Sequence, residues 1–122
     1  MADRWEVFTE ISFESAHFLP EVPEGHKCRR LHGHSFRVRV FLADSRLARE
    51  GWVEDFAVLK SRLEPLRQQL DHRLLNEIVG LENPTSEQLA AWIWPRAKSV
   101  LPNLHCVEVL ETCTSGCRFF GS

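Results

Sequence analysis

Three histidines lie at positions where two neighbouring strands could bring them together. His32 and His34 are separated by one glycine, and residues i and i+2 of a strand project from the same face. His17 ends the preceding alternating segment, so antiparallel pairing of the two segments would bring it to the same place. Three neutral imidazoles suit Zn²⁺ and leave a fourth position for water or substrate. Each histidine alone would more often be an ordinary surface or core residue, and only the combination predicts a metal site.

Cys28 lies four residues before His32, in a basic segment with Lys27, Arg29 and Arg30. Positive charge and a nearby metal ion favour the thiolate, which is the reactive form of cysteine. Most cysteines are instead small buried apolar residues, but the polar surroundings of Cys28 argue against that role. Cys28 could also be a fourth zinc ligand, which would make the site closed and structural. Lys27 and its basic neighbours could hold a small anionic substrate or simply face water.

Two carboxylates are further candidates. Asp71 directly precedes His72, and a carboxylate can orient an imidazole as a proton donor or acceptor. Alternatively, His72 is only a histidine favoured by the dipole at a helix C-terminus. Glu111 falls on the apolar face of its segment, where a carboxylate needs a partner. A heterocycle with an amino group beside a ring N–H would supply paired hydrogen bonds; an internal ion pair or a register error would explain Glu111 without a ligand.

The remaining candidates are weaker. Thr85 and Ser86 are first of all residues that begin a helix, although an exposed helix N-terminus can also meet a ligand. Cys113 and Cys117 are three residues apart around a turn, and one such pair is a poor indication of zinc binding.

The elements that must position these residues follow from hydrophobic periodicity. Alternation of apolar and polar residues predicts strands over 5–18, 32–43 and 104–113, and a short last strand over 118–120 after a turn at Gly116. Apolar residues spaced three and four apart, beginning with Phe56, predict a helix over 55–70 that Asp55 caps.

A second helix is expected to begin at Thr85, which has the capping-box spacing to Gln88, and to carry an apolar stripe that ends at Val100. Pro65 in the first helix predicts a kink or break, and Pro95 interrupts the second. The order ββααββ predicts an α+β fold, in which two helices cover one face of a four-stranded antiparallel sheet.

Length and composition limit the class of protein. The 122 residues indicate a single domain spanning 1–122, large enough for its own core. A formal net charge of −2 leaves no basic excess for nucleic-acid binding. No apolar stretch approaches the about 18 residues of a membrane helix, and the N-terminus lacks a signal-peptide pattern. We therefore expect a cytoplasmic protein with reduced cysteines.

Several segments together resemble the 6-pyruvoyl-tetrahydropterin synthase family, and the likeness covers almost the whole chain. They are His17, the C-x₃-H-G-H run from Cys28 to His34, and residues 51–56, 70–72, 82–86 and 111–114. The C-x₃-H-G-H spacing is similar to that of the bacterial branch that forms 6-carboxytetrahydropterin for queuosine biosynthesis. The 6-pyruvoyl enzymes of animals typically place two more residues between that cysteine and H-G-H.

The resemblance implies the tunnelling fold, in which trimers close their sheets into a barrel and two trimers stack as a hexamer with active sites between subunits. It implies conversion of 7,8-dihydroneopterin triphosphate to 6-carboxytetrahydropterin, acetaldehyde and triphosphate, with zinc and without nicotinamide or flavin. The roles carried over are zinc ligands for His17, His32 and His34, the proton-abstracting base for Cys28, a relay for Asp71 and His72, the pterin anchor for Glu111, and contacts to the ring for Thr85 and Ser86.

Three other functions remain open at this point. A 6-pyruvoyl-tetrahydropterin synthase would use the same residues and release a different product. A cupin-like metal oxygenase also uses an H-x-H strand, but no glutamate follows His34 within a few residues, and two helices do not suit an all-β barrel. A non-catalytic binding module stabilised by zinc would need the histidines alone.

Overall fold

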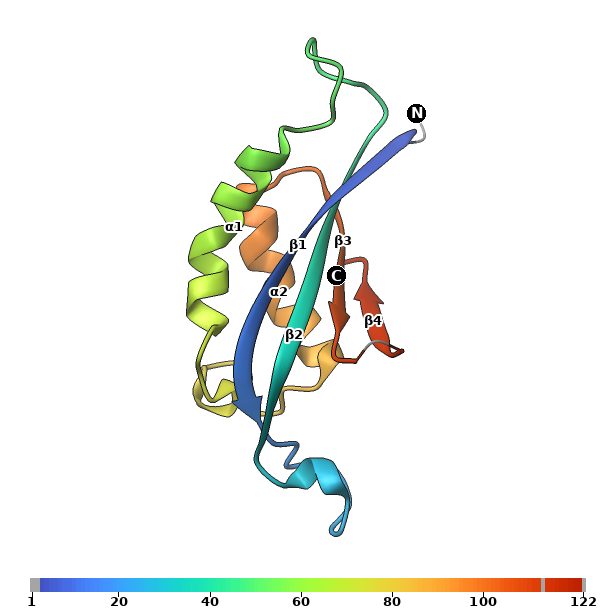
Figure 1. The fold of residues 1–122 in the computed structure, drawn as a ribbon. Helices are drawn as coiled ribbons and strands as arrows, with labels where there is room; N and C mark the ends of the chain where they lie inside the picture. The colour runs from blue at the N-terminus through green and yellow to red at the C-terminus, as the bar shows by residue number, and fades with distance from the viewer. Residues whose placement is uncertain (1–2, 113, 122) are drawn as a thin grey trace.

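The computed structural model describes residues 3–112 and 114–121 and has the predicted α+β architecture. The elements, in chain order, are β1 (Trp5–His17), the 3₁₀ turn η1 (Lys27–Arg29), β2 (His32–Asp44), α1 (Phe56–Leu70), the 3₁₀ turn η2 (Leu75–Glu77), α2 (Ser86–Val100), β3 (Leu104–Leu110) and β4 (Gly116–Phe119). The strands form one antiparallel sheet in the order β1-β2-β3-β4. Both helices cover the same face of this sheet (Figure 1). The predicted order ββααββ is confirmed.

The long hairpin of β1 and β2 sets the layout of the sheet. Its register pairs Trp5 with Asp44 at one end and His17 with His32 at the other. Every second side chain of each strand enters the core under the helices, as the alternation predicted; these are Ile11 and Phe13 on β1 and Phe36, Val38, Val40 and Leu42 on β2. The two strands therefore present one continuous apolar stripe that runs toward the histidines.

The two helices begin at the predicted caps and bury their leucines against the sheet. The Asp55 carboxylate accepts the Ala57 backbone N–H at 2.8 Å, and the Thr85 hydroxyl accepts that of Gln88 at 3.1 Å. The predicted stripes are wrong at their ends, because Phe56 is 56% exposed and Val100 is 40% exposed. Both lie in a terminal turn of a helix. None of the described helices is long and apolar enough to span a membrane.

The prolines do not interrupt either helix. Residues 56–70 and 86–100 form two continuous helices with Pro65 and Pro95 inside them, so the predicted break at Pro65 is wrong. Both prolines are exposed, as are the residues four positions earlier, Ser61 and Ala91. The carbonyl groups that lose a helical partner thus belong to residues that water reaches, which reduces the cost of each proline.

The last two strands differ from the prediction. β3 ends at Leu110, so Glu111 lies in a bend beyond the strand and not within it. β4 begins at Gly116 and ends before Phe120, so Gly116 opens the strand instead of making the turn. A Cβ on Gly116 would lie 2.6 Å from both the Leu110 side chain and the Val109 carbonyl, which explains why glycine stands there. Of Cys113 and Cys117, whose spacing is a poor indication of zinc binding, Cys113 lies outside the described residues.

Replacing Pro65 with alanine is expected to raise the free energy of unfolding by about 1–3 kcal/mol, because alanine restores the missing N–H and removes the clash of the ring. Denaturant titration of the two proteins measures the difference. Ser61→Ala, at an exposed position of the same helix, is the control and should change stability by less than about 0.5 kcal/mol. A less stable Pro65→Ala protein would mean that α1 is shaped around its proline.

Candidate metal centre and active site

The three histidines meet at the end of the β1–β2 hairpin. His17 continues the core side of β1, and His34 and His32 continue that of β2, beyond the point where apolar residues fill it. The three rings each offer one nitrogen to a group whose members lie within 4.8 Å of one another. His17 is only 1% exposed, and Phe36, which is fully buried, packs against the His34 ring at a centroid distance of 4.0 Å. The predicted metal cluster is therefore assembled, and it rests directly on the core.

The hydrogen bonds of the three rings fix which nitrogen is free. The Nδ1 atoms of His17, His32 and His34 lie 3.0, 2.7 and 3.1 Å from the backbone oxygens of Pro84, Arg30 and Ser35, respectively. A carbonyl oxygen can only accept, so each Nδ1 donates its proton and each neutral ring keeps a lone pair on Nε2. Metal-binding histidines in proteins are commonly held in this way.

The three Nε2 atoms are placed so that they could bind one metal cation. The Nε2 atoms of His17 and His34 lie 3.2 Å apart, and neither can donate to the other while both Nδ1 atoms are protonated. Tetrahedral zinc, with Zn–N bonds of about 2.0–2.1 Å, would hold two ligand nitrogens about 3.4 Å apart. Burial is the largest influence on the pKa of His17 and lowers it; the hydrogen bond to Pro84 and the charge of Glu111 oppose this only in part, and the pKa stays below its usual value. The neutral, metal-binding form of His17 is therefore favoured, and the three side chains fit a divalent metal ion.

Two residues that the sequence analysis did not single out hold His17 in place. Pro84 supplies the carbonyl that accepts the His17 proton. Asn76 accepts the Phe18 backbone N–H at 3.0 Å and donates to the Phe18 and Glu82 carbonyls at 2.8 and 3.3 Å. Asn76 thus ties the end of β1 to the segment that leads to Pro84. Nothing in the sequence pattern marks these roles, because they depend on backbone groups and on contacts about 60 residues apart in the chain.

Cys28 and Glu111 come together beside the histidines, as the carried-over roles require. A cavity of about 470 Å³ is lined by Lys27, Cys28, His32, His34, Glu111 and Thr112. Its size lies within the range of small-molecule sites. Cys28 is a free thiol. The Arg29 guanidinium is already engaged within its own loop, because it donates to the Pro20 and Val22 carbonyls at 3.0 and 2.9 Å.

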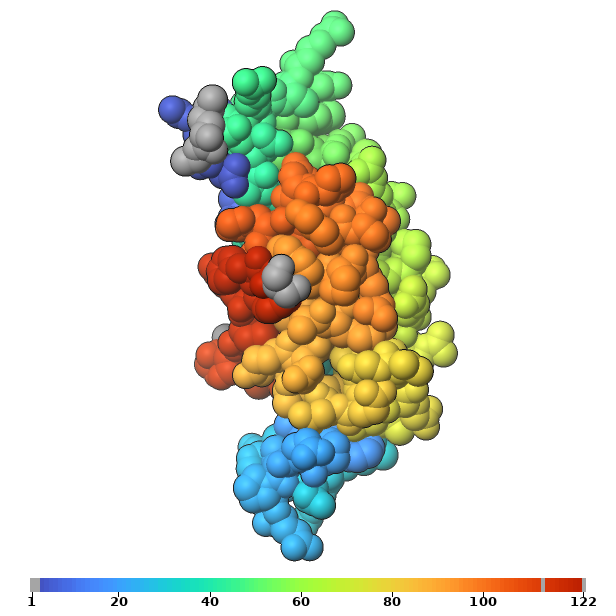
Figure 2. All heavy atoms as spheres, turned by 180° about the vertical axis from the view of Figure 1, so that it is seen from behind, coloured from blue at the N-terminus to red at the C-terminus, as the bar shows by residue number. Residues whose placement is uncertain are grey.

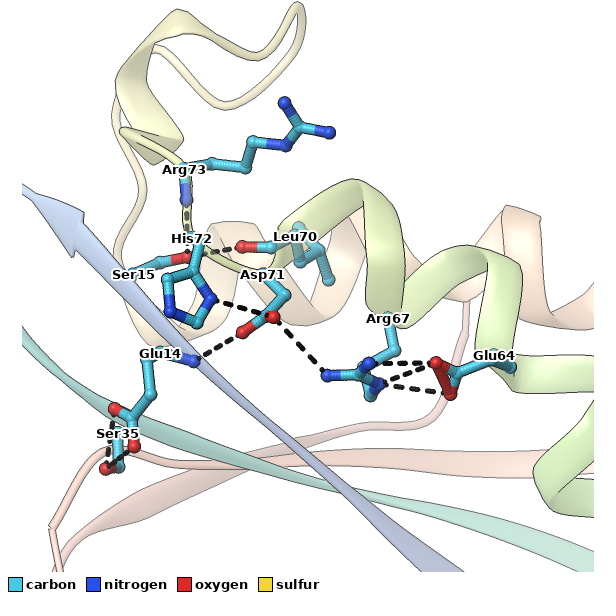
Figure 3. A network of polar contacts seen from close by, with 9 residues as sticks. All are labelled: Glu14, Ser15, Ser35, Glu64, Arg67, Leu70, Asp71, His72 and Arg73. Carbon is cyan, nitrogen blue, oxygen red and sulfur yellow. Dashed lines mark hydrogen bonds and ion pairs between the residues drawn. The ribbon is translucent and has the colours of Figure 1, made fainter.

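Asp71 and His72 form the predicted pair, at the outer edge of β1. The Asp71 carboxylate accepts the Glu14 backbone N–H at 3.0 Å and lies 2.9 Å from His72 Nδ1 and 3.5 Å from the Arg67 guanidinium (Figure 3). The hydrogen bond from Glu14 and then that from His72 hold the pKa of Asp71 below its usual value. The carboxylate therefore stays ionised and can keep the His72 proton on Nδ1.

The backbone of His72 is in the left-handed region, with φ at 55°. A residue other than glycine takes this conformation at a cost of about 1 kcal/mol or more. The His72 N–H donates to the Glu14 carbonyl at 2.6 Å, which helps to hold the conformation. The side chain is 79% exposed and lines a second cavity, of about 500 Å³, together with His34 and Gly33. Within one chain, Cys28 and His72 thus line different cavities on either side of His34.

Thr85 and Ser86 stand at the start of α2, directly after Pro84. The described residues that line the two cavities beside the histidines do not include Thr85 or Ser86. Their carried-over contact with a substrate ring therefore stays a prediction.

A four-stranded antiparallel sheet with two helices on one face and three convergent histidines at its end defines a tunnelling-fold protein. A solved 6-pyruvoyl tetrahydropterin synthase of Caenorhabditis elegans covers 100% of both chains with a TM-score of 0.83 and 27% identity. The profile of the 6-pyruvoyl tetrahydropterin synthase family matches residues 6–122. The chain belongs to this family.

Its relatives carry more than one activity. A 6-carboxy-5,6,7,8-tetrahydropterin synthase of Synechocystis sp. is 55% identical over 122 residues, which cover 95% of this chain and 93% of the relative. A dihydroneopterin monophosphate aldolase of Pyrococcus furiosus is 37% identical over 96 residues, with coverages of 79% and 77%. The comparison places the chain nearer in sequence to the first of these two proteins.

His34→Ala is expected to abolish most metal binding, because it removes one of three ligands. The buried His17 is unchanged, so the fold should be retained. Divalent metal added to the unaltered protein at about 100 times its Kd should stabilise it by about 2.7 kcal/mol, whereas His34→Ala should show almost no shift. Metal analysis and thermal unfolding measure the two effects. His105→Ala, on β3, serves as the control and should bind metal normally. Equal metal content in His34→Ala and the unaltered protein would contradict the assigned ligands.

Proposed function

We propose that this protein is a zinc-dependent lyase that converts 7,8-dihydroneopterin triphosphate and one water molecule to 6-carboxy-5,6,7,8-tetrahydropterin, acetaldehyde and triphosphate, as a step of queuosine biosynthesis. The observation that carries the proposal is a single cavity lined by Lys27, Cys28 and Glu111 together with two of the three histidines. The 55% identity to the Synechocystis enzyme supports the choice of product. The protein would act in the cytoplasm, where cysteines stay reduced; the three cysteines that the structure describes, Cys28, Cys106 and Cys117, form no disulfide with one another.

Each side chain around the cavity would have a separate role in the reaction. His17, His32 and His34 would hold zinc, which when bound supplies a Lewis acid that polarises the side-chain hydroxyls of the substrate. The Glu111 carboxylate would accept paired hydrogen bonds from the amino group and ring N–H of the pterin. Lys27 would offer positive charge to the triphosphate. The Cys28 thiolate would remove a carbon-bound proton, and no redox cofactor is needed for the internal rearrangement.

The relay of Asp71 and His72 would act in an active site shared between subunits. In one chain His72 opens on a different cavity from Cys28, although both cavities reach His34. The sheet is open, with β1 and β4 as its outer strands. Its helix-free face carries a charged network beside the paired rings of Phe8 and Phe41. The network consists of Glu10, Arg37, Arg39, Glu108 and Arg118. Three such sheets joined at their edges would make a barrel whose lining includes this charged network, and two barrels would stack as the hexamer.

The alternatives differ in what they would leave unexplained. A 6-pyruvoyl-tetrahydropterin synthase would use the same site and differ only in its product. A binding module stabilised by zinc would not need Cys28 and Glu111 beside an open cavity. A cupin-like oxygenase does not fit, because the fold is a single open sheet with two helices.

Incubation of zinc-loaded protein with 7,8-dihydroneopterin triphosphate, under reducing anaerobic conditions, tests the proposal by product mass. We expect 6-carboxytetrahydropterin together with acetaldehyde. Release of 6-pyruvoyl-tetrahydropterin would assign the protein to the other branch, with the same metal site. A folded, zinc-loaded protein that leaves the substrate unchanged would support the binding module.

Cys28→Ala is expected to keep the fold and one metal ion per chain while turnover falls by about a hundredfold or more, since it lacks the proposed base. Steady-state turnover and metal analysis of the same preparation separate the two roles of the thiol. Cys117→Ala, on β4, is the matched control and should remain active. Loss of metal from Cys28→Ala would show instead that the thiol is a fourth ligand.

A further inference from the structure

The loop that carries Cys28 stands apart from the two-layer body of the protein. Residues 18–31 project beyond the end of the sheet, next to the segment that connects the two helices (Figure 2). No residue of this loop is fully buried, and its only regular element is the three-residue turn η1. A short, exposed turn has little packing to fix it, so the position of Cys28 must depend on specific hydrogen bonds.

Both backbone groups of Cys28 are engaged. Its N–H donates to Nδ1 of His26 at 3.1 Å, and its carbonyl accepts the Leu19 N–H at 2.8 Å. The first of these bonds depends on a side chain, whereas the second joins two backbone groups. His26 is thus the one residue whose side chain directly holds the Cys28 backbone among the described contacts.

His26 acts here as the N-cap of η1. Its backbone is extended, with φ −67° and ψ 133°, and its carbonyl accepts the Arg29 N–H at 3.1 Å. In a capped turn, a side-chain acceptor binds the N–H group two or three residues further along. Cys28 stands two residues after His26, so the imidazole takes the place that Asn, Asp, Ser or Thr usually occupies. In this contact Nδ1 is the acceptor, so the ring proton must lie on Nε2 when the cap is formed.

The rest of the loop is arranged so that this cap can act. The His26 N–H donates to the Pro23 carbonyl at 3.0 Å, which orients the residue before the turn. The Arg29 guanidinium closes the first part of the loop through its bonds to Pro20 and Val22. The side chain of Cys28 has one rotatable bond before its sulfur, so a fixed backbone limits Sγ to a few positions.

We propose that His26 is a positioning residue: by capping η1 through the Cys28 N–H, it fixes the place from which the Cys28 thiolate reaches the substrate. The inference rests on the proposed function, because it assumes that Cys28 is the base. His26 neither contacts the described cavity nor moves a proton in this role. A base displaced by about an ångström loses much of its rate advantage, even when substrate binding is unchanged.

Four zinc-loaded variants test the role of His26. His26→Ala removes the acceptor, His26→Asn replaces it with a good N-cap, and His26→Gln carries the same amide one methylene further from the backbone. Cys28→Ala tests the base itself. We expect His26→Ala and His26→Gln to lower kcat about fivefold, which corresponds to the loss of a typical cap, with KM changed less than about twofold. His26→Asn should stay within about twofold of the unaltered enzyme.

A second readout follows the hydrogen bond directly. The Cys28 amide proton should exchange with solvent about fivefold faster in His26→Ala and His26→Gln than in His26→Asn, because only asparagine places an acceptor at the right distance to cap the turn. Zinc content and melting temperature are measured in each variant, so that a general loss of fold is recognised. If His26→Ala unfolds, the comparison of Asn with Gln still decides the matter.

The outcomes separate this proposal from the function on which it rests. Full kcat in His26→Ala, or equal loss in His26→Asn and His26→Ala, would overturn the capping role while Cys28→Ala stays inactive. Full turnover in Cys28→Ala would overturn the assignment of the base, and the positioning role with it. Equal amide exchange in the Asn and Gln variants would also count against capping, whatever their turnover.

Discussion

The register of the β1–β2 hairpin is the constraint on which the rest of the site depends. His17 and His32 face one another only because the two thirteen-residue strands pair as they do. A slip of one residue would move alternate side chains to the opposite face of the sheet and would separate the ligands. The same slip would expose Phe36 and Val38, which are fully buried. Burial of the core thus fixes the register, and the register fixes the metal site.

The site combines a rigid part with two segments outside regular strands. The metal ligands continue the core positions of paired strands, and their Nδ1 atoms are held by backbone carbonyls. Cys28 and Glu111 come from a projecting loop and from the bend after β3. A metal ion bound there would be held by the part of the fold that is most costly to deform. The groups proposed to meet the substrate lie instead on segments that a few local hydrogen bonds hold in place.

The sequence predicted the elements that local periodicity and capping residues can reveal. Alternation identified β1 and β2, the spacing of leucines identified α1, and the cap at Thr85 located the start of α2. It misplaced Glu111, because a carboxylate two residues after Val109 continues the alternation even though the strand has ended. It did not predict the separate cavities beside Cys28 and His72, nor the roles of Asn76 and Pro84, because these depend on contacts between distant parts of the chain and on backbone atoms that no residue type reveals.

His72 has a consequence for how this fold can be altered. Glycine or asparagine would adopt its left-handed backbone more easily, so the histidine is kept at the expense of conformational free energy. A search for more heat-resistant variants that scored only the folded fraction would therefore favour changes at this position. Such a search would return proteins that fold better and lack the imidazole of the Asp71 pair. At this one position, stability of the fold and the proposed relay role favour different amino acids. A measurement of heat resistance alone would not distinguish a variant that keeps the imidazole from one that has lost it.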